Sequence, residues 1–305
     1  MAAGTVDRAD DPSGEPLADP ARRARLQALL LAWYHRTARD LPWRGDADPW
    51  AVLVSEAMLQ QTQVARVVPI FASFMARWPT APALAAAPAG EVVAAWQGLG
   101  YNRRALRLHR AATVITSEHG GTVPEDLGML QRLPGVGAYT ARAVAAFAHG
   151  LAVAPVDTNV ARVLARLHGR ALSRAAAQER ADALVPDRDP GAWGQALMEL
   201  GARVCTARTP RCDECPVAPM CAWRGQGPDP AASSAHRSRP QARFEGSDRQ
   251  VRGRLVQALR ERPVPGPELS AAAGEPDAER VRRLADALVA EGMAEWDANA
   301  LRLPR

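Results

Sequence analysis

The chain has 305 residues, 47% of them hydrophobic, which is enough to bury one large core or two smaller ones. Its formal net charge of +5 favours a polyanionic partner. All 38 basic side chains are arginine, since the sequence contains no lysine, and this excludes chemistry based on a lysine amine. No signal-peptide pattern and no apolar run of membrane-spanning length is found, so we expect a cytoplasmic protein without a membrane partner.

Apolar residues recur at helical spacing through most of the chain. Residues 1–21 are polar and rich in Pro, Gly and Asp, and we expect a disordered tail there. From Arg22 onward the pattern is helical, and Asp48 and Asp126 are predicted to begin helices. Because no convincing run of alternating strands precedes residue 290, we expect an all-α main body. The predicted helices after the first cover 50–65, 66–77, 89–97, 103–118, 125–132, 137–149, 158–168, 174–185 and 190–204.

The C-terminal quarter divides into two predicted parts. Residues 224–246 are poor in apolar side chains and rich in Pro, Ser and Arg, which predicts a linker. Residues 247–305 then form a small compact unit, with a hairpin turn predicted at 297–299. Three helices and a terminal hairpin favour a winged-helix-like module, and a plain helical bundle is the alternative. The three helices are expected at 248–261, 266–273 and 276–291.

All four cysteines lie in one short stretch, with the spacing Cys205-x6-Cys212-x2-Cys215-x5-Cys221. In a reducing compartment such clustering indicates a metal site rather than disulfides. Four thiolates can hold either Zn²⁺ or a [4Fe–4S] cluster. Zinc sites usually present two closely spaced pairs, and only one such pair is present. The single-loop arrangement therefore favours the [4Fe–4S] cluster.

Two features suggest contacts with phosphate groups. The turn Gly135-Val136-Gly137 joins two predicted helices, and such a turn lets a phosphate approach the backbone and the following helix N-terminus. A turn of this type often serves only to join helices. Arg208 and Arg211, between the first two cysteines, are also placed to bind phosphates. A solvated surface loop is the alternative for both arginines.

Two carboxylates stand in contrasting surroundings. Glu56 lies in a helix that is apolar nearly all round, so burial is expected to raise its pKa above about 4.3 and keep it protonated. Taken alone, a buried glutamate is more often a satisfied structural residue. Asp157 begins the predicted helix 158–168, where it can cap the helix and stay ionised. A neutral acid and an ionised carboxylate together are typical of acid-assisted bond cleavage.

Several motifs together resemble the MutY-type adenine DNA glycosylases of the helix-hairpin-helix, endonuclease III superfamily. They are the cysteine spacing, the glycine turn followed by Asp157, and three stretches: 41–44 (LPWR), 56–63 (EAMLQQTQ) and 195–202 (QALMELGA). The resemblance covers about residues 25–223. It implies a two-lobed body over 22–223, with a six-helix domain of about 47–154 and a cluster domain of 22–46 with 155–223. The active site is expected in the cleft between them.

The resemblance also implies roles for single residues. Glu56 matches the acid that protonates adenine at N7, and Asp157 matches the carboxylate that stabilises the oxocarbenium-like sugar. Asn159 matches a residue that orients the catalytic groups. Tyr139 occupies the position at which lyase-competent relatives carry lysine. Two further pairs match substrate-binding positions: Arg44 and Gln195 at the flipped adenine, and Gln61 and Tyr101 beside the opposing 8-oxoguanine.

The implied function is that of a monofunctional glycosylase, a monomer that releases adenine from A:8-oxoguanine or A:G mispairs in double-stranded DNA. Two departures from the family pattern stand out. The family's Gly-Leu-Gly-Tyr-Tyr ends here in Asn102, and no MutT-like domain is evident after Cys221. Discrimination between 8-oxoguanine and guanine is therefore expected to be weaker, or to be supplied by residues 247–305. The alternatives are an endonuclease III-type pyrimidine glycosylase with lyase activity, a non-enzymatic Fe–S regulator that binds DNA, and a ferredoxin-like electron carrier.

Overall fold

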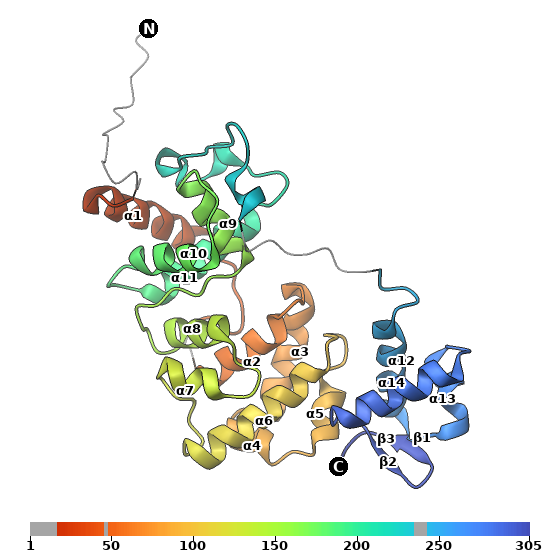
Figure 1. The fold of residues 1–305 in the computed structure, drawn as a ribbon. Coiled ribbons are helices and arrows are strands. Elements are labelled where there is room, and N and C mark those ends of the chain that lie inside the picture. The colour runs from red at the N-terminus through yellow and green to blue at the C-terminus, as the bar shows by residue number, and fades with distance from the viewer. Residues whose placement is uncertain (1–16, 46–47, 235–242) are drawn as a thin grey trace. The chain divides into compact units, whose positions relative to one another are not determined.

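The computed structural model describes residues 17–45, 48–234 and 243–305. Its described residues fall into two compact units (Figure 1). Unit 1 contains the described residues of 1–39 and 150–239, and unit 2 contains those of 40–149 and 240–305. Most of the expected N-terminal tail, residues 1–16, lies outside the described residues.

Unit 1 is helical. Its first helix, α1 (Pro20–Thr37), starts two residues before the predicted position, because the Asp19 carboxylate accepts hydrogen bonds from the backbone N–H groups of Ala21 and Arg22. The remaining elements of unit 1 are α9 (Thr158–Leu167), α10 (Arg174–Ala183), α11 (Pro190–Arg203) and the 3-10 turns η1 (Cys212–Glu214), η2 (Ala218–Met220) and η3 (Pro230–Ser233).

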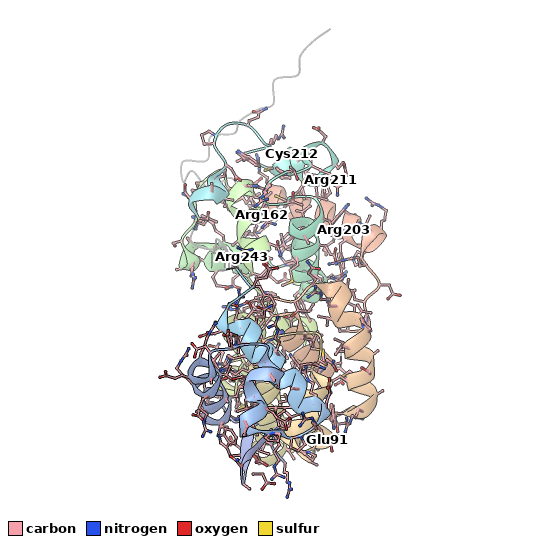
Figure 2. All side chains as sticks on the ribbon, turned by 90° about the vertical axis from the view of Figure 1, so that its right-hand side faces the viewer. Glu91, Arg162, Arg203, Arg211, Cys212 and Arg243 are labelled. Carbon is pink, nitrogen blue, oxygen red and sulfur yellow. The ribbon has the colours of Figure 1, made fainter. Side chains whose placement is uncertain are left out.

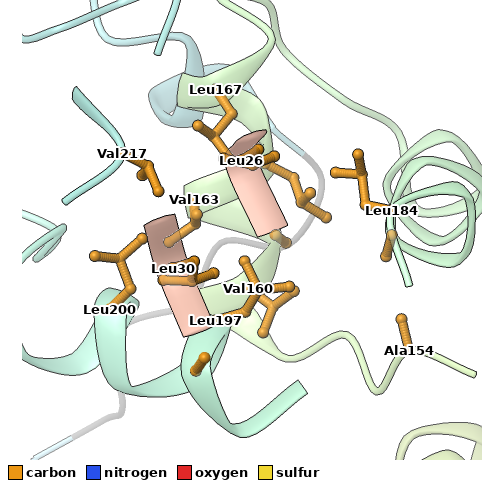
Figure 3. Close-up of a cluster of buried hydrophobic side chains, with 14 of the residues drawn as sticks. Leu26, Leu30, Ala154, Val160, Val163, Leu167, Leu184, Leu197, Leu200 and Val217 are labelled. Atoms are coloured by element: carbon orange, nitrogen blue, oxygen red, sulfur yellow. The ribbon is translucent and has the colours of Figure 1, made fainter. Parts of the chain in front are cut away.

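Three of these helices share the core of unit 1 (Figure 3). Leu26 and Leu30 of α1 are fully buried, as their spacing of four residues predicts. They belong to the same buried cluster as Val160 and Val163 of α9 and Leu197 of α11. Each such side chain contributes about 1.5–3 kcal/mol through burial. This core fixes the start of α9, which carries Asp157, relative to α11.

The first part of unit 2 contains seven helices among its described residues: α2 (Pro49–Leu59), α3 (Val64–Arg77), α4 (Ala81–Ala85), α5 (Ala89–Ala95), α6 (Arg103–Glu118), α7 (Leu127–Arg132) and α8 (Ala138–Phe147). Asp48 and Asp126 cap α2 and α7, as predicted. The predicted helix 50–65 was wrong at its end, because α2 stops at Leu59 and Gln61 adopts a left-handed conformation with φ 59°. The short helix α4 was not predicted.

The C-terminal part of unit 2 has the element order of a winged helix. It contains α12 (Asp248–Glu261), β1 (Val264–Pro265), the turn η4 (Gly266–Glu268), α13 (Leu269–Ala273), α14 (Ala278–Ala290), β2 (Glu295–Asp297) and β3 (Ala300–Arg302). The three strands are antiparallel in the order β1-β3-β2, and Leu301 lies opposite both Val264 and Trp296. The sheet rules out a plain helical bundle. The two-residue strand β1, which pairs with the terminal hairpin, was not predicted.

Part of the segment predicted as a linker packs against unit 1. Ala231 in η3 is buried, and Asp229 forms an ion pair with Arg166 of α9 over 2.7 Å. Residues 235–242 lie outside the described residues. Among the helices that the structure describes, none has the length and apolar character needed to cross a membrane.

Candidate functional site

Glu56 lies on α2 and is only 7% exposed. Three residues within two positions of it in the helix, Val54, Ser55 and Met58, are also buried. The prediction that the Glu56 side chain is buried is therefore confirmed.

A buried arginine that the sequence analysis missed holds the segment after α2. Arg104 of α6 is 7% exposed, and burial lowers the pKa of its guanidinium to about 10, so that it stays charged at neutral pH. The charge is stabilised by hydrogen bonds to one hydroxyl and four backbone carbonyl groups. These acceptors are Thr62 Oγ1 at 2.9 Å, Ala57 at 2.9 Å, Met58 at 2.8 Å, Leu99 at 3.1 Å and Gly100 at 3.0 Å.

Two of these acceptors, the Ala57 and Met58 carbonyls, lie at the end of α2, and the other three lie in two loops that each carry an exposed residue with positive φ. Gln61 has φ 59° in the first loop, and Tyr101 has φ 47° in the second and is 41% exposed. The Thr62 hydroxyl also donates to the Leu99 carbonyl over 3.1 Å and so joins the loops directly. Left-handed backbone at a non-glycine residue costs about 1–3 kcal/mol and persists only where the surroundings impose it. Gln61 and Tyr101 are the two residues predicted to enter the duplex.

Asp157 caps α9 in unit 1, as predicted. Its Oδ1 accepts hydrogen bonds from the backbone N–H groups of Asn159 at 2.9 Å and Val160 at 2.7 Å. Its Oδ2 accepts from Asn159 Nδ2 at 2.8 Å. Asp157 and Asn159 are thus hydrogen-bonded to each other within a single helical turn. These three donors fix the position of the carboxylate at the N-terminus of α9.

Asn159 is itself held by Arg162, one turn further along α9. Arg162 Nη2 donates to Asn159 Oδ1 at 2.8 Å and to the Gly201 carbonyl at 2.7 Å, and its Nε donates to the Cys205 carbonyl at 2.8 Å. A continuous set of hydrogen bonds therefore runs from Asp157 to the first cysteine of the cysteine loop. Figure 2 shows Arg162 in unit 1 together with Arg203, Arg211 and Cys212.

The predicted hairpin joins α7 and α8 in unit 2. Gly135 has φ 84°, and a Cβ atom at this position would stand 2.8 Å from the Cβ of Arg107. Gly137 caps α8 without a side chain, and a Cβ there would meet nothing within 4 Å. Gly135 is thus required by the turn, whereas Gly137 leaves the N-terminus of α8 open to an anion.

The four cysteines line one pocket together with Arg166 and Trp223. Among the described residues, no three His, Cys, Asp or Glu side chains are arranged to hold a single metal ion. Four cysteine side chains that line one pocket can serve as the ligands of an iron–sulfur cluster. Burial raises the pKa of the Cys215 thiol to about 12 and also raises that of Cys221. Four thiolates here therefore need the positive charge of a metal centre.

Arg166 of α9 binds residues that form this pocket. Its guanidinium donates to Cys205 Sγ at 3.2 Å and to the Thr206 carbonyl at 2.8 Å, and it lies 4.6 Å from the ring centroid of Trp223. Burial would lower the pKa of Arg166, but hydrogen bonds with Asp229 and Cys205 outweigh it and the pKa is raised. A fixed positive charge beside a thiolate favours the charged form that metal ligation requires.

The remaining predicted residues lie in both units. Arg44 is half-buried in unit 2, as is Tyr139 at the start of α8. Gln195 of α11 in unit 1 accepts a hydrogen bond from the Tyr34 hydroxyl. Arg208 is exposed. Arg211 is exposed as well, but it pairs with Glu214 over 2.9 Å.

Comparisons with protein families agree with this arrangement. The HhH-GPD superfamily of base excision DNA repair proteins matches residues 54–186, a range that contains Glu56, the hairpin and Asp157. The iron–sulfur binding domain of endonuclease III matches residues 205–221, the cysteine loop. The cofactor of this chain is a [4Fe–4S] cluster.

Two relatives that cover most of this chain, and a third that covers two thirds of it, are adenine DNA glycosylases. The adenine DNA glycosylase of Mycobacterium tuberculosis (strain ATCC 25618 / H37Rv) is 52% identical over 273 residues, which cover 85% of this chain and 88% of its own length. The adenine DNA glycosylase of Mycolicibacterium smegmatis is 49% identical over 277 residues, with coverages of 88% and 92%. The human adenine DNA glycosylase is 44% identical over 68% of this chain and 40% of its own length.

Solved structures share the fold. A thermostable thymine-DNA glycosylase superposes with a TM-score of 0.63 and 30% identity, covering 67% of this chain and 97% of its own. Endonuclease III in a trapped covalent intermediate with DNA superposes with a TM-score of 0.58 and 23% identity, with the same coverages.

Proposed function

This chain belongs to the adenine DNA glycosylases of the HhH-GPD superfamily of base excision DNA repair proteins, and we propose that it hydrolyses the N-glycosidic bond of adenine mispaired with 8-oxoguanine or guanine in double-stranded DNA. The observation that carries the proposal is the position of Glu56. It is an acid buried in the apolar helix α2, and Arg104 anchors both the end of this helix and the loop that follows it.

The reaction begins with the adenine turned out of the duplex. The protonated carboxyl of Glu56 donates to adenine N7, so that the base leaves as a neutral group when the bond between N9 and the sugar breaks. The carboxylate of Asp157, fixed by Asn159 and the N-terminus of α9, stabilises the positive sugar. Water then adds to C1′ and releases a proton, which leaves adenine and an abasic site and restores Glu56.

Binding roles follow from the same proposal. Arg44 and Gln195 hold the flipped adenine, while Gln61 and Tyr101 enter the duplex beside the opposite base. Tyr139 stands at the start of α8, where lysine-dependent relatives carry their nucleophile. Because the chain has no lysine, a lyase step of that kind is disfavoured. The protein acts as a monomer.

The backbone of the hairpin 135–137 and Arg208 bind phosphates. Cys205, Cys212, Cys215 and Cys221 hold the [4Fe–4S] cluster, which, when bound, fixes the loop that contributes Arg208. Arg211 takes a weaker part in phosphate binding because Glu214 already pairs with it.

Single-turnover release of adenine from A:8-oxoguanine, A:G and A:C duplexes tests the proposal. The Glu56→Gln variant is expected to release adenine about 10²–10⁴-fold more slowly, because it removes the general acid. Ser55→Ala, a change at the neighbouring buried residue, is the matched control and is expected to react within about 2-fold of wild type. Equal rates for wild type and Glu56→Gln, or efficient trapping of a covalent adduct by borohydride, would refute the proposed mechanism.

A further inference from the structure

The winged-helix part of unit 2, residues 247–305, makes polar contacts with the segment that ends in the Tyr101 loop. Arg249 Nη1 of α12 donates to the Tyr101 hydroxyl at 3.2 Å. Arg260, about three turns further along the same helix, donates to Asn102 Oδ1 at 3.4 Å and to the Val93 carbonyl at 3.1 Å. One helix of this module, α12, therefore contacts two consecutive residues of the loop through its side chains.

A second contact joins the module to the start of α6, directly after the loop. Glu291, at the end of α14, pairs with Arg103, the residue after Asn102. The same carboxylate pairs with Arg252 of α12 over 2.5 Å, and its side chain is only 18% exposed. Tyr101, Asn102 and Arg103 are thus each bound by a residue of the module.

A third set of contacts fixes the segment before the loop. Gln97 Nε2 donates to Gln257 Oε1 of α12 at 3.1 Å. At the start of α5, the Gly90 N–H donates to the Pro304 carbonyl at 2.9 Å, and a Cβ at Gly90 would stand 2.3 Å from that oxygen. Only glycine allows this approach. The module therefore contacts the chain from residue 90 to residue 103.

In many helix-turn-helix proteins one helix, the recognition helix, contacts the bases of DNA. The corresponding helix of this module is α14, and its arginines form ion pairs within the module. Arg280 of α14 bonds to Asp248 over 2.8 Å and to Glu275 over 2.7 Å, and Arg282 bonds to Asp286 over 3.2 Å. These carboxylates oppose a close approach of phosphates. They favour a role for the module within the protein over a role as an independent reader of DNA.

We propose that the C-terminal module braces the Tyr101 loop, with Arg249 and Arg260 as positioning residues for the wedge that faces the base opposite adenine. This inference rests on the proposed function, according to which Tyr101 enters the duplex. Arg104 holds the backbone of the loop from inside the protein, and Arg249 holds the phenol from outside. The family's second tyrosine is asparagine here, and the Asn102 amide oxygen accepts from Arg260, which gives this departure a physical reason.

A double-mutant cycle tests the contact between Arg249 and Tyr101. Binding is measured in the Glu56→Gln background, which blocks base release, as the ratio of Kd values for an A:8-oxoguanine duplex and an undamaged duplex. Tyr101→Phe keeps the ring and removes only the hydroxyl. In the protein that retains Arg249, Tyr101→Phe is expected to reduce the preference for the mispair about 5-fold. In the Arg249→Ala protein, the same change is expected to reduce it less than 2-fold.

Arg283→Ala is the matched control, because it removes an exposed arginine of the same module that pairs with Asp248 over 3.6 Å. It is expected to leave the preference unchanged. Additive effects of Tyr101→Phe and Arg249→Ala would overturn the inference. So would a uniform loss of affinity for both duplexes in Arg283→Ala, because that result would make the module an independent DNA-binding domain.

Amide hydrogen exchange of the protein without DNA gives a readout that needs no activity. The Arg249→Ala/Arg260→Ala double variant is expected to exchange at residues 98–103 at least 10-fold faster than wild type, with unchanged exchange in α9 of unit 1. Equal exchange at residues 98–103 would refute the brace even if adenine release is observed. Conversely, a protein that releases no adenine but shows the faster exchange would refute the proposed function and leave the brace intact.

Discussion

Arg104 donates to the Thr62 hydroxyl over 2.9 Å and thereby joins the two loops that carry Gln61 and Tyr101. The same guanidinium binds carbonyl groups at the end of α2, which carries Glu56. One buried cation therefore fixes the acid-bearing helix and both strained loops. The loops need such a support because each holds a non-glycine residue at positive φ.

Replacement of Arg104 by alanine is expected to lower the free energy of unfolding by about 3–5 kcal/mol, because several buried carbonyl groups lose a charged donor. Urea unfolding measures this loss, and Arg66→Ala, at an exposed arginine of α3, is the control. Arg104→Lys is expected to recover only part of the stability, since an ammonium group lacks the planar fork of donors. A fully stable Arg104→Ala protein would show that Arg104 does not hold these loops.

The caps and the buried acid could be predicted because their signals are local. Asp48, Asp126 and Asp157 precede apolar periodic runs, and Glu56 lies within one. Arg104 could not be found in this way, because an arginine in the first turn of a helix normally points to solvent, and its burial depends on contacts 42 and 46 residues away in the sequence. The end of α2 was misplaced for the same reason, since tertiary contacts with Arg104 hold Thr62 outside the helix. The joint action of Glu56 and Asp157 in one cleft stays a prediction.

The two glycines of the hairpin are expected to respond differently to alanine. Gly135→Ala forces a Cβ into the Arg107 side chain at φ 84°, so the free energy of unfolding should fall by about 1–3 kcal/mol. Gly137→Ala meets no atom within 4 Å and should leave stability within about 0.5 kcal/mol. It should still weaken binding to duplex DNA several-fold, because a methyl group then stands where a phosphate approaches. Unchanged DNA binding by Gly137→Ala would remove the hairpin from the proposed phosphate contacts.

Gly201 on α11 is expected to tolerate substitution by alanine poorly, because it lies close to Asn159. A Cβ at Gly201 would stand 2.7 Å from the Asn159 Cβ and 3.0 Å from its carbonyl oxygen. Gly201→Ala should therefore cost about 1–3 kcal/mol of stability and displace the partner of Asp157, which lowers the rate of adenine release. Gly253→Ala in α12, with no atom within 4 Å, should instead stabilise the protein by about 1 kcal/mol. Thermal unfolding and single-turnover assays of both variants decide whether the effect is specific to Gly201.

The carboxylate of Glu291 is expected to make the stability of the protein depend on pH. Burial raises the pKa of Glu291, but hydrogen bonds from Arg103 and Arg252 outweigh burial and place the pKa below its ordinary value of 4.5. At pH 7 the carboxylate is ionised in both the folded and the unfolded chain, so the full contribution of the ion pairs is present. Below about pH 4.5 the unfolded chain takes up a proton first, and the contribution is lost as the pH falls through the pKa of the folded state.

Glu291→Gln should therefore be about 1.5 kcal/mol less stable than wild type at pH 7, since it weakens two charged hydrogen bonds. The difference should shrink steadily below pH 4.5, because wild type loses the same interaction there. Urea unfolding of both proteins at pH 7 and pH 3.5 measures this change. Both proteins contain the iron–sulfur cluster, so an effect of acid on the cluster cancels when their free energies of unfolding at the same pH are subtracted. Glu118→Gln, at an exposed carboxylate of α6, should differ from wild type by less than about 0.5 kcal/mol at both pH values. A difference for Glu291→Gln that stayed constant over this range would mean that its ionised carboxylate does not bind Arg103 and Arg252 in solution.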